Sequence, residues 1–198
     1  MQKTVQIEIA QQDVTFLKAN ANQLCFARKV NDIYNVVWRA SGGFLTSNRF
    51  TYSPKYELFA SNSVTPGEVV RIGTTLGIRP GEQAVLAESG IFGPPATGGP
   101  LDGITLINRF GAIHPGLRCI STGIDGAQIV TPIFVTPQVV VPGDTVLTPA
   151  DKVLVWFQQV VVQGAVFVQQ RIPNAVEIDL TLVNSATRLY RNGGWSQP

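Results

Sequence analysis

The sequence contains a single histidine, two cysteines and one methionine among its 198 residues. These are too few imidazole and thiolate ligands for a zinc site, and the carboxylates are dispersed, so we expect no metal centre and no other cofactor. The two cysteines, Cys25 and Cys119, lie far apart and cannot build a disulfide framework. This favours a cytoplasmic protein with reduced thiols, the alternative being a secreted protein without a visible signal peptide in this chain.

Charge is also scarce in this chain. Only 14% of the residues are charged and the formal net charge is +2, whereas about a quarter of the residues are charged in a typical domain. The cations form no basic run, so we expect no binding to nucleic acid through its phosphates. A weakly charged surface repels copies of itself poorly, which favours a homo-oligomer.

Long apolar runs are missing as well. No stretch reaches the roughly eighteen apolar residues of a spanning helix, so the sequence predicts no transmembrane helix, while contact with a membrane surface stays open. Near the N-terminus, Val5, Ile7 and Ile9 alternate with polar residues. This alternation predicts a half-buried strand rather than the continuous apolar core of a signal peptide.

Glycine and proline, by contrast, are abundant, with 19 and 13 residues. They separate short runs rich in Val, Ile, Phe and Tyr, and helical periodicity is almost absent; even the short run 14–17 is expected to be a strand. The pattern predicts an all-β fold, a single antiparallel β-sandwich domain over residues 1–198 of the jelly-roll or immunoglobulin-like type. We expect about ten or more short strands and at most one or two short helical turns.

Several short motifs predict turns. Pro66–Gly67, Pro80–Gly81 and Pro142–Gly143 each precede an acidic residue, and proline followed by glycine suits a type II turn that leads into a strand. Asn192–Gly193 predicts a tight hairpin turn near the C-terminus. Thr148–Asp151 matches a capping box, which predicts one helical turn there.

Two proline-containing segments are expected to be irregular. Residues 93–103 contain four glycines and three prolines, which predicts a connecting loop, with a lid or binding loop as the alternative. Residues 129–141 are extended but interrupted by Pro132 and Pro137. Because proline cannot donate a ladder hydrogen bond, this segment is expected at a sheet edge or at a bulge.

Residues 151–173 form the longest apolar region, with Gln163–Gly164 at its centre. The pattern predicts a long β-hairpin that turns at Gln163–Gly164. Counting outward from that turn predicts a core face made of Val155, Phe157, Val161, Val166, Val168 and Ile172. The opposite face then carries the candidate ligand-binding residues Trp156, Gln158, Gln169 and Arg171, with a cation–π contact between Trp156 and Arg171. Trp195 completes this candidate set as an aromatic side chain expected to be partly exposed.

Catalytic residues can be sought only around His114. A general base needs an orienting carboxylate, for which Asp102 or Asp125 is a candidate, and Cys119 could act as a nucleophile. Nothing in the spacing brings these groups together, and a turn histidine with a buried thiol is the favoured interpretation. We therefore expect that the protein is not an enzyme.

Three functions from different classes remain. The first is a non-catalytic recognition protein, lectin-like or of a defence type, which works as an oligomer and binds a carbohydrate or another small ligand. The second is a pore-forming or membrane-lytic toxin that inserts the hairpin, whose strands of about ten residues are long enough to cross a bilayer. The glutamines midway along both strands weaken this second hypothesis. The third is a small enzyme with a His114-centred pocket.

Overall fold

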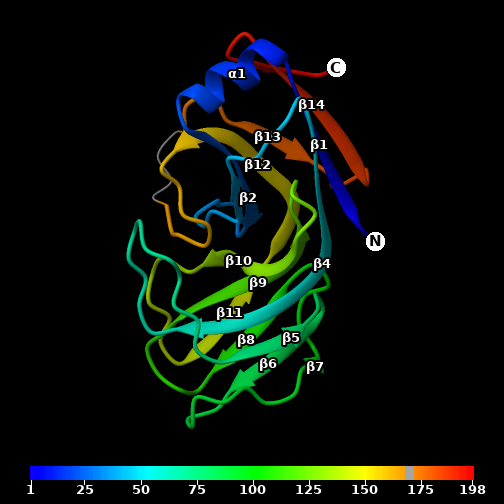
Figure 1. Cartoon of the computed structure of the whole chain (residues 1–198). Coiled ribbons are helices and arrows are strands. Elements are labelled where there is room, and N and C mark those ends of the chain that lie inside the picture. The colour runs from blue at the N-terminus through cyan, green and yellow to red at the C-terminus, as the bar shows by residue number, and fades with distance from the viewer. Residues whose placement is uncertain (168–171) are drawn as a thin grey trace.

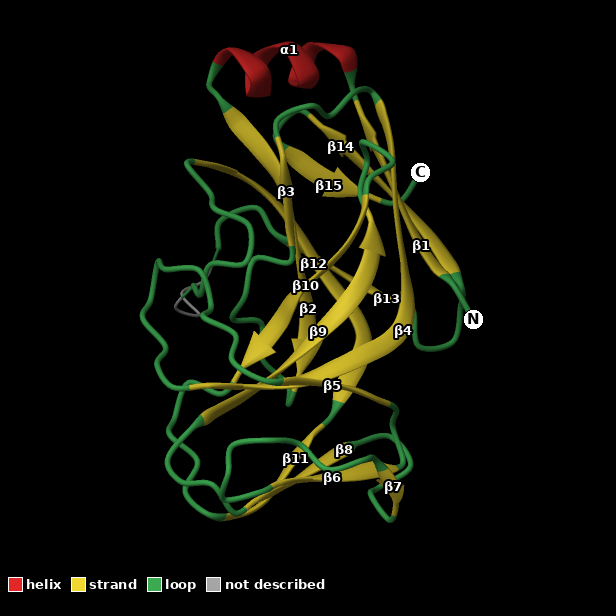
Figure 2. Ribbon diagram, turned by 60° about the horizontal axis from the view of Figure 1, so that its bottom comes forward, coloured by secondary structure: helices red, strands yellow, loops and turns green. Residues whose placement is uncertain are grey.

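A computed structural model describes residues 1–167 and 172–198 of the chain. These residues form fifteen strands and one helix, so the expectation of a mostly β protein is confirmed. The strands are arranged in three sheets, and the molecule is elongated (Figure 1). The helix α1 (Gln11–Ala19) lies at one end and one of the two smaller sheets lies at the other (Figure 2).

The largest sheet has seven strands and contains both ends of the chain. In spatial order it consists of β10 (Gln128–Val135), β9 (His114–Thr122), β4 (Ser47–Ser61), β1 (Lys3–Ile9), β14 (Ser185–Arg191) and β15 (Gly194–Ser196), with β5 (Thr75–Ile78) paired to β4. Side chains alternate along β1 between buried and half-buried, as the sequence predicts. The segment 129–141 also behaves as expected, because β10 is an edge strand and its register shifts next to Pro132.

Two smaller sheets have four strands each. The first runs β13 (Val176–Asp179), β12 (Pro149–Gln159), β2 (Asn22–Val30) and β3 (Arg39–Ser41). The second runs β11 (Gly143–Leu147), β8 (Ile104–Asn108), β6 (Glu82–Leu86) and β7 (Ala96–Thr97). The 93–103 segment is indeed mostly loop, and only the two residues of β7 are regular. One apolar cluster includes buried side chains from all three sheets, among them Val5, Leu24 and Leu106.

The prediction of a purely antiparallel fold was wrong, because two of the three sheets are mixed. β1 and β14 are parallel, and so are β6 and β8. The N-terminal strand lies between β4 and β14, so the two terminal segments of the chain pair with each other in the same direction. A sandwich of the jelly-roll or immunoglobulin-like type is not confirmed by this strand order.

The predicted hairpin over residues 151–173 was also wrong. Gln163–Gly164 does form a turn, but Ala165 and Val166 bridge to Val69 and Val36 rather than to the preceding strand. β12 instead pairs with β2 on one side and β13 on the other, with Trp156 opposite Cys25. A two-stranded ribbon is weak on its own, whereas pairing with β2 and β13 satisfies both edges of β12. Packing in the two apolar clusters buries side chains on both of its faces.

The observed faces of residues 151–173 therefore differ from the predicted ones. Val155 packs in the main apolar cluster and Phe157 packs against it, as expected for the core face. Trp156, expected on the outer face, is fully buried in a second cluster with Cys25, Ala27, Tyr34 and Val37. Val161 and Ile172 pack against this second cluster rather than the main one, and Val166 packs in a third cluster. Val168 lies outside the described residues.

Two local predictions, one for residues 14–17 and one for residues 148–151, were wrong. Residues 14–17, expected as a strand, lie in α1, where Val14 and Leu17 are three positions apart and both buried. At nine residues, α1 is longer than the one or two helical turns expected. Thr148–Asp151 was expected as a helical turn, but Pro149 and Asp151 lie in β12. Pro149 pairs with Val30, and the Asp151 carboxylate binds Arg28.

Candidate functional site

The structure separates His114 from the other catalytic candidates. His114 begins β9 and is buried, and its Nδ1–H donates to the Thr136 carbonyl oxygen, 2.8 Å away. Cys119 lies five positions along the same strand, so its side chain is on the opposite face of the sheet. Asp102 is exposed in the turn before β8, and Asp125 pairs with Arg39 at 3.0 Å rather than with His114.

Neither cysteine is placed as a nucleophile. Both thiols are fully buried and are not joined to each other. Burial raises the pKa of Cys25 to about 12 and also raises the pKa of Cys119 above its ordinary value. Because the thiolate is the reactive form, a neutral buried thiol is inert.

The most highly charged buried cluster surrounds Arg28 in β2, whose side chain is wholly buried. Its guanidinium donates to Asp151 Oδ1 at 2.9 Å and to the Tyr56 hydroxyl at 2.5 Å. The ring of Tyr52 lies 4.5 Å from the guanidinium carbon, a cation–π contact, and Cys119 Sγ accepts from Arg28 at 3.2 Å. Strands β2, β4, β9 and β12 therefore meet at one cation.

This cluster links several strands through ion pairs and hydrogen bonds. Asp151 is also 3.4 Å from Lys3 Nζ, which donates to the carbonyl oxygens of Leu180 and Val183. The Asp151 carboxylate thus links β2, β12 and β1 in one network. The buried charge of Arg28 is compensated by partners within the protein, so we assign the cluster a structural role.

No group of three or more potential metal ligands occurs among residues 1–167 and 172–198. Among the described residues, a cleft lies beside α1.

A cleft of about 670 Å³ lies between α1, the end of β12 and the segments 160–167 and 172–174. This volume is within the range that holds a drug-sized molecule. Five aromatic side chains line the cleft: Phe16, Trp156, Phe157, Phe167 and Tyr190. Among the described residues, the lining side chains that carry polar groups include Asn22, Gln158, Asn174 and the tyrosine Tyr190.

Trp156 and Gln158 lie on the same face of β12 and both line the cleft. Trp156 is buried and its Nε1–H donates to Gln158 Oε1 at 2.9 Å. Gln158 itself is exposed. A buried aromatic wall is therefore joined by a hydrogen bond to a polar group at the mouth of the cleft.

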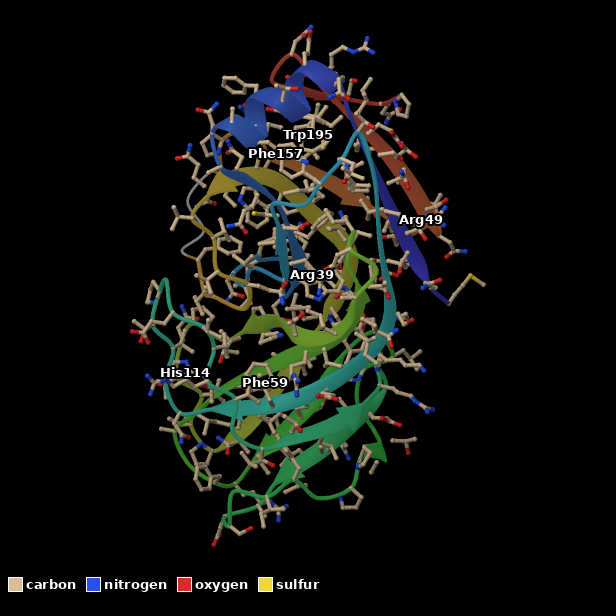
Figure 3. All side chains as sticks on the ribbon, viewed as in Figure 1. Arg39, Arg49, Phe59, His114, Phe157 and Trp195 are labelled. Carbon is tan, nitrogen blue, oxygen red and sulfur yellow. The ribbon has the colours of Figure 1, made fainter. Side chains whose placement is uncertain are left out.

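Two of the lining aromatic side chains also pack on each other and on Trp195. Phe157 stacks on Trp195, with ring centroids 5.7 Å apart and planes 9° from parallel, and contacts Tyr190 at 4.8 Å. The Trp195 indole donates to the Asn174 carbonyl oxygen at 2.6 Å. Figure 3 shows Phe157 and Trp195 beneath α1, while His114 lies in a different part of the molecule.

The mouth of the cleft carries exposed apolar side chains. Phe16 on α1 is 65% exposed, and Val160 and Val162 are 91% and 54% exposed. Val160 also has a positive φ of 49°, which is rare for a β-branched residue. The chain leaves β12 at this residue, so the positive φ is located where β12 ends and the cleft begins.

Of the five ligand-binding residues predicted from sequence, Trp156 and Gln158 line the cleft and Trp195 packs against its wall. Gln169 and Arg171 lie outside the described residues. Sequence reasoning missed Phe16 and Tyr190, because the first belongs to a segment expected to be a strand and the second comes from β14, far away along the chain. Only the apolar character of the 151–173 region pointed to this part of the molecule.

No family model, curated protein or solved structure matches the chain. A search of the described residues finds no helix that combines the length and the apolar character needed to cross a membrane.

Proposed function

We propose that the protein is a non-catalytic recognition protein that binds a small ligand in the cleft between α1 and the segment after β12. The observation that carries this proposal is a cavity of about 670 Å³ with five aromatic side chains and a few neutral polar groups in its lining. Concave apolar cavities with a small number of polar groups are the usual form of a small-molecule site.

The non-catalytic part of the proposal is supported by the placement of the reactive groups. His114 is engaged with Thr136, and Cys119 is a buried neutral thiol that contacts Arg28. Neither residue is among those that line the cleft. A nucleophile and a base must be within hydrogen-bonding reach of the reacting atoms, and the cleft brings together no such pair from the described residues.

The toxin hypothesis loses its support because it required a hairpin that could leave the body of the protein. β12 is paired on both sides, with β2 and β13, and its side chains are buried in two clusters. We therefore do not carry this hypothesis forward. A sandwich-type classification, a homo-oligomeric state and a cytoplasmic or secreted location stay within the proposal as expectations from the sequence.

The proposal is tested by screening a library of small neutral compounds, sugars included, by ligand-observed NMR. Val162→Trp places a bulky ring at the mouth of the cleft, where the native side chain is half exposed. Leu182→Trp is the matched control, because Leu182 is 96% exposed and does not line the cleft. We expect compounds that bind the native protein and Leu182→Trp but not Val162→Trp. If no compound binds, or if both variants bind alike, the proposed function is refuted.

A further inference from the structure

The strand β5 has an open edge. It pairs with β4 on one side, and no second strand pairs with it among the described residues. Just before β5, the Thr74 carbonyl oxygen accepts the backbone N–H of Ala60 at 3.4 Å, so Thr74 points toward β4. Alternate residues of an antiparallel strand direct their backbone groups to opposite edges. Thr75 and Gly77 therefore direct their N–H and C=O groups away from β4.

The edge strand β11 shows how such an edge can be closed. There the side chain of Asn31 donates to the Val146 carbonyl oxygen at 3.1 Å and accepts the Thr148 N–H at 2.7 Å. An amide side chain thus occupies the place of a neighbouring strand, which is one way to protect an edge from further pairing. Within the part of the chain that the structure describes, no group bonds the outward backbone of Thr75 or Gly77 in this way.

A groove of about 550 Å³ lies against the edge of β5. Gly77 and Ile78 of β5 line it, together with Pro54 and Lys55 of β4 and Pro95 before β7. Figure 2 shows β5 between β4 and the small sheet that contains β6 and β7. A Cβ atom added at Gly77 would have no atom within 4 Å, so the space beside this residue is open to another chain.

Charged side chains also line this groove. The register between β4 and β9 shifts next to residues 53–55, a bulge that takes Lys55 out of the ladder. Lys55 and Arg79, which follows β5, are both exposed and both line the groove. Glu82 lines it as well, but its Oε2 already accepts the backbone N–H of Arg79 at 2.8 Å. The groove therefore presents two cations beside one carboxylate that is engaged in a turn.

We propose that β5 binds an extended acidic segment of a partner protein, which pairs with it as an additional strand. The outward backbone groups of Thr75 and Gly77 bind the main chain of the partner, and Lys55 and Arg79 bind its carboxylates. Main-chain hydrogen bonds of this kind give affinity, and the side-chain contacts give specificity. None of these four residues lines the cleft beside α1, so this proposal is independent of the function proposed above.

The test uses the peptide acetyl-Glu-Val-Glu-Val-Glu-Val-amide, which is acidic and favours an extended chain. It is titrated into isotope-labelled protein and followed by NMR. We expect the amide resonances of Thr75 and Gly77 to shift, and the exchange of the Gly77 N–H with solvent to slow. The same peptide with every amide N-methylated should bind at least about 10-fold more weakly, because its backbone donors are lost. A Lys-Val peptide of equal length should bind at least about 3-fold more weakly.

Variants of the protein locate the contacts. Lys55→Ala and Arg79→Ala should each weaken binding of the Glu-Val peptide by about 2- to 5-fold, the effect of one exposed ion pair. Arg49→Ala is the matched control, since Arg49 is an exposed cation of β4 that does not line the groove. Gly77→Pro removes the outward N–H and leaves the ladder with β4 intact, so it should abolish binding. Its melting temperature shows whether it folds.

Several outcomes would overturn the proposal. Equal affinity of the N-methylated peptide would show that backbone pairing is not used, and equal affinity of the Lys-Val peptide would show no preference for carboxylates. Absence of binding by the Glu-Val peptide also overturns it. If light scattering finds an oligomer that Gly77→Pro converts to a monomer, the edge is occupied by a second copy instead. Should Gly77→Pro fail to fold, the N-methylated peptide decides with the native protein.

Discussion

Trp156 donates its indole N–H to the side-chain oxygen of Gln158, two residues further along β12, over 2.9 Å. The pair connects a fully buried ring to an exposed amide on one face of a strand. Because the indole donor is satisfied by Gln158 rather than by water, the ring can remain buried in its cluster.

The Arg28 network leads to a prediction about stability. Asp151→Asn removes the charge that compensates the wholly buried guanidinium of Arg28, while the side chain stays almost the same size. We expect a loss of about 3 kcal/mol in the free energy of unfolding, toward the lower end for a broken buried ion pair because Asp151 is partly exposed. Urea unfolding monitored by circular dichroism measures this loss.

The control for this prediction is Asp102→Asn, which changes an exposed carboxylate that makes no ion pair with the described residues. It should alter the free energy of unfolding by less than about 0.5 kcal/mol. Equal effects of the two substitutions would show that the Arg28–Asp151 pair does not stabilise the fold.

Gly116 in β9 is predicted to tolerate no side chain. A Cβ atom there would collide with the ring of Phe59 and with the carbonyl oxygen of Phe134, and the carbonyl belongs to the backbone of a neighbouring strand. We expect Gly116→Ala to cost about 3 kcal/mol or more, because the strands must separate to admit the methyl group. The measurement is the urea midpoint, or the soluble yield if the variant does not fold.

Gly77→Ala is the matched control for Gly116→Ala. Gly77 also lies in a strand, β5, but no atom would approach its added Cβ within 4 Å and its φ is not positive. Its substitution should be neutral or stabilise the protein by up to about 1 kcal/mol through the unfolded chain. A stable Gly116→Ala variant would disprove the close contact of β9 with Phe59.

Val160 is predicted to be a site of stored strain. Its φ of 49° is unfavourable for a β-branched side chain, and the side chain is 91% exposed, so almost no packing is lost on substitution. Val160→Asn should therefore raise the free energy of unfolding by about 1 kcal/mol, since asparagine tolerates this conformation. Val139→Asn, at an exposed valine without positive φ, should give no gain. An unchanged urea midpoint in Val160→Asn would contradict the prediction.

Acid should destabilise the protein partly through Asp179. Hydrogen bonds from Thr181, together with Lys152 at 3.1 Å, lower the pKa of Asp179 from 3.8 to about 2. Because the folded-state pKa lies below the unfolded one, this carboxylate stabilises the fold above pH 3.8 and loses that contribution as the pH falls to about 2. Asp179→Asn should show a flatter decline of the melting temperature over this window than the native protein.

Asp144→Asn is the comparison for the acid experiment, because Asp144 is exposed and forms no ion pair with the described residues. Its melting temperature should follow that of the native protein across the same pH window. If Asp179→Asn and the native protein decline in parallel, the hydrogen bonds of Asp179 do not contribute to acid sensitivity.

The sequence by itself determined the features that depend on neighbouring residues. Gly67 and Gly81 have φ values of 84° and 88°, as type II turns require, and Asn192 and Gly193 have the positive pair of a tight hairpin turn. Gly143 is also positive, at 146°, but departs from the type II value. These agreements arise because φ preferences are local and act in any context.

Only the tertiary structure decided which strands pair and where the cleft forms. Gln163–Gly164 turns as its sequence indicates, yet the flanking apolar segments pair elsewhere, because β2 and β13 satisfy the two edges of β12 while two apolar clusters bury its side chains. The lining of the cleft joins Phe16 from the start of the chain, Trp156 from β12 and Tyr190 from near its end. Local sequence patterns show that each of these residues is aromatic. Their side chains come together through the burial of residues far apart along the chain, which no short stretch of sequence specifies.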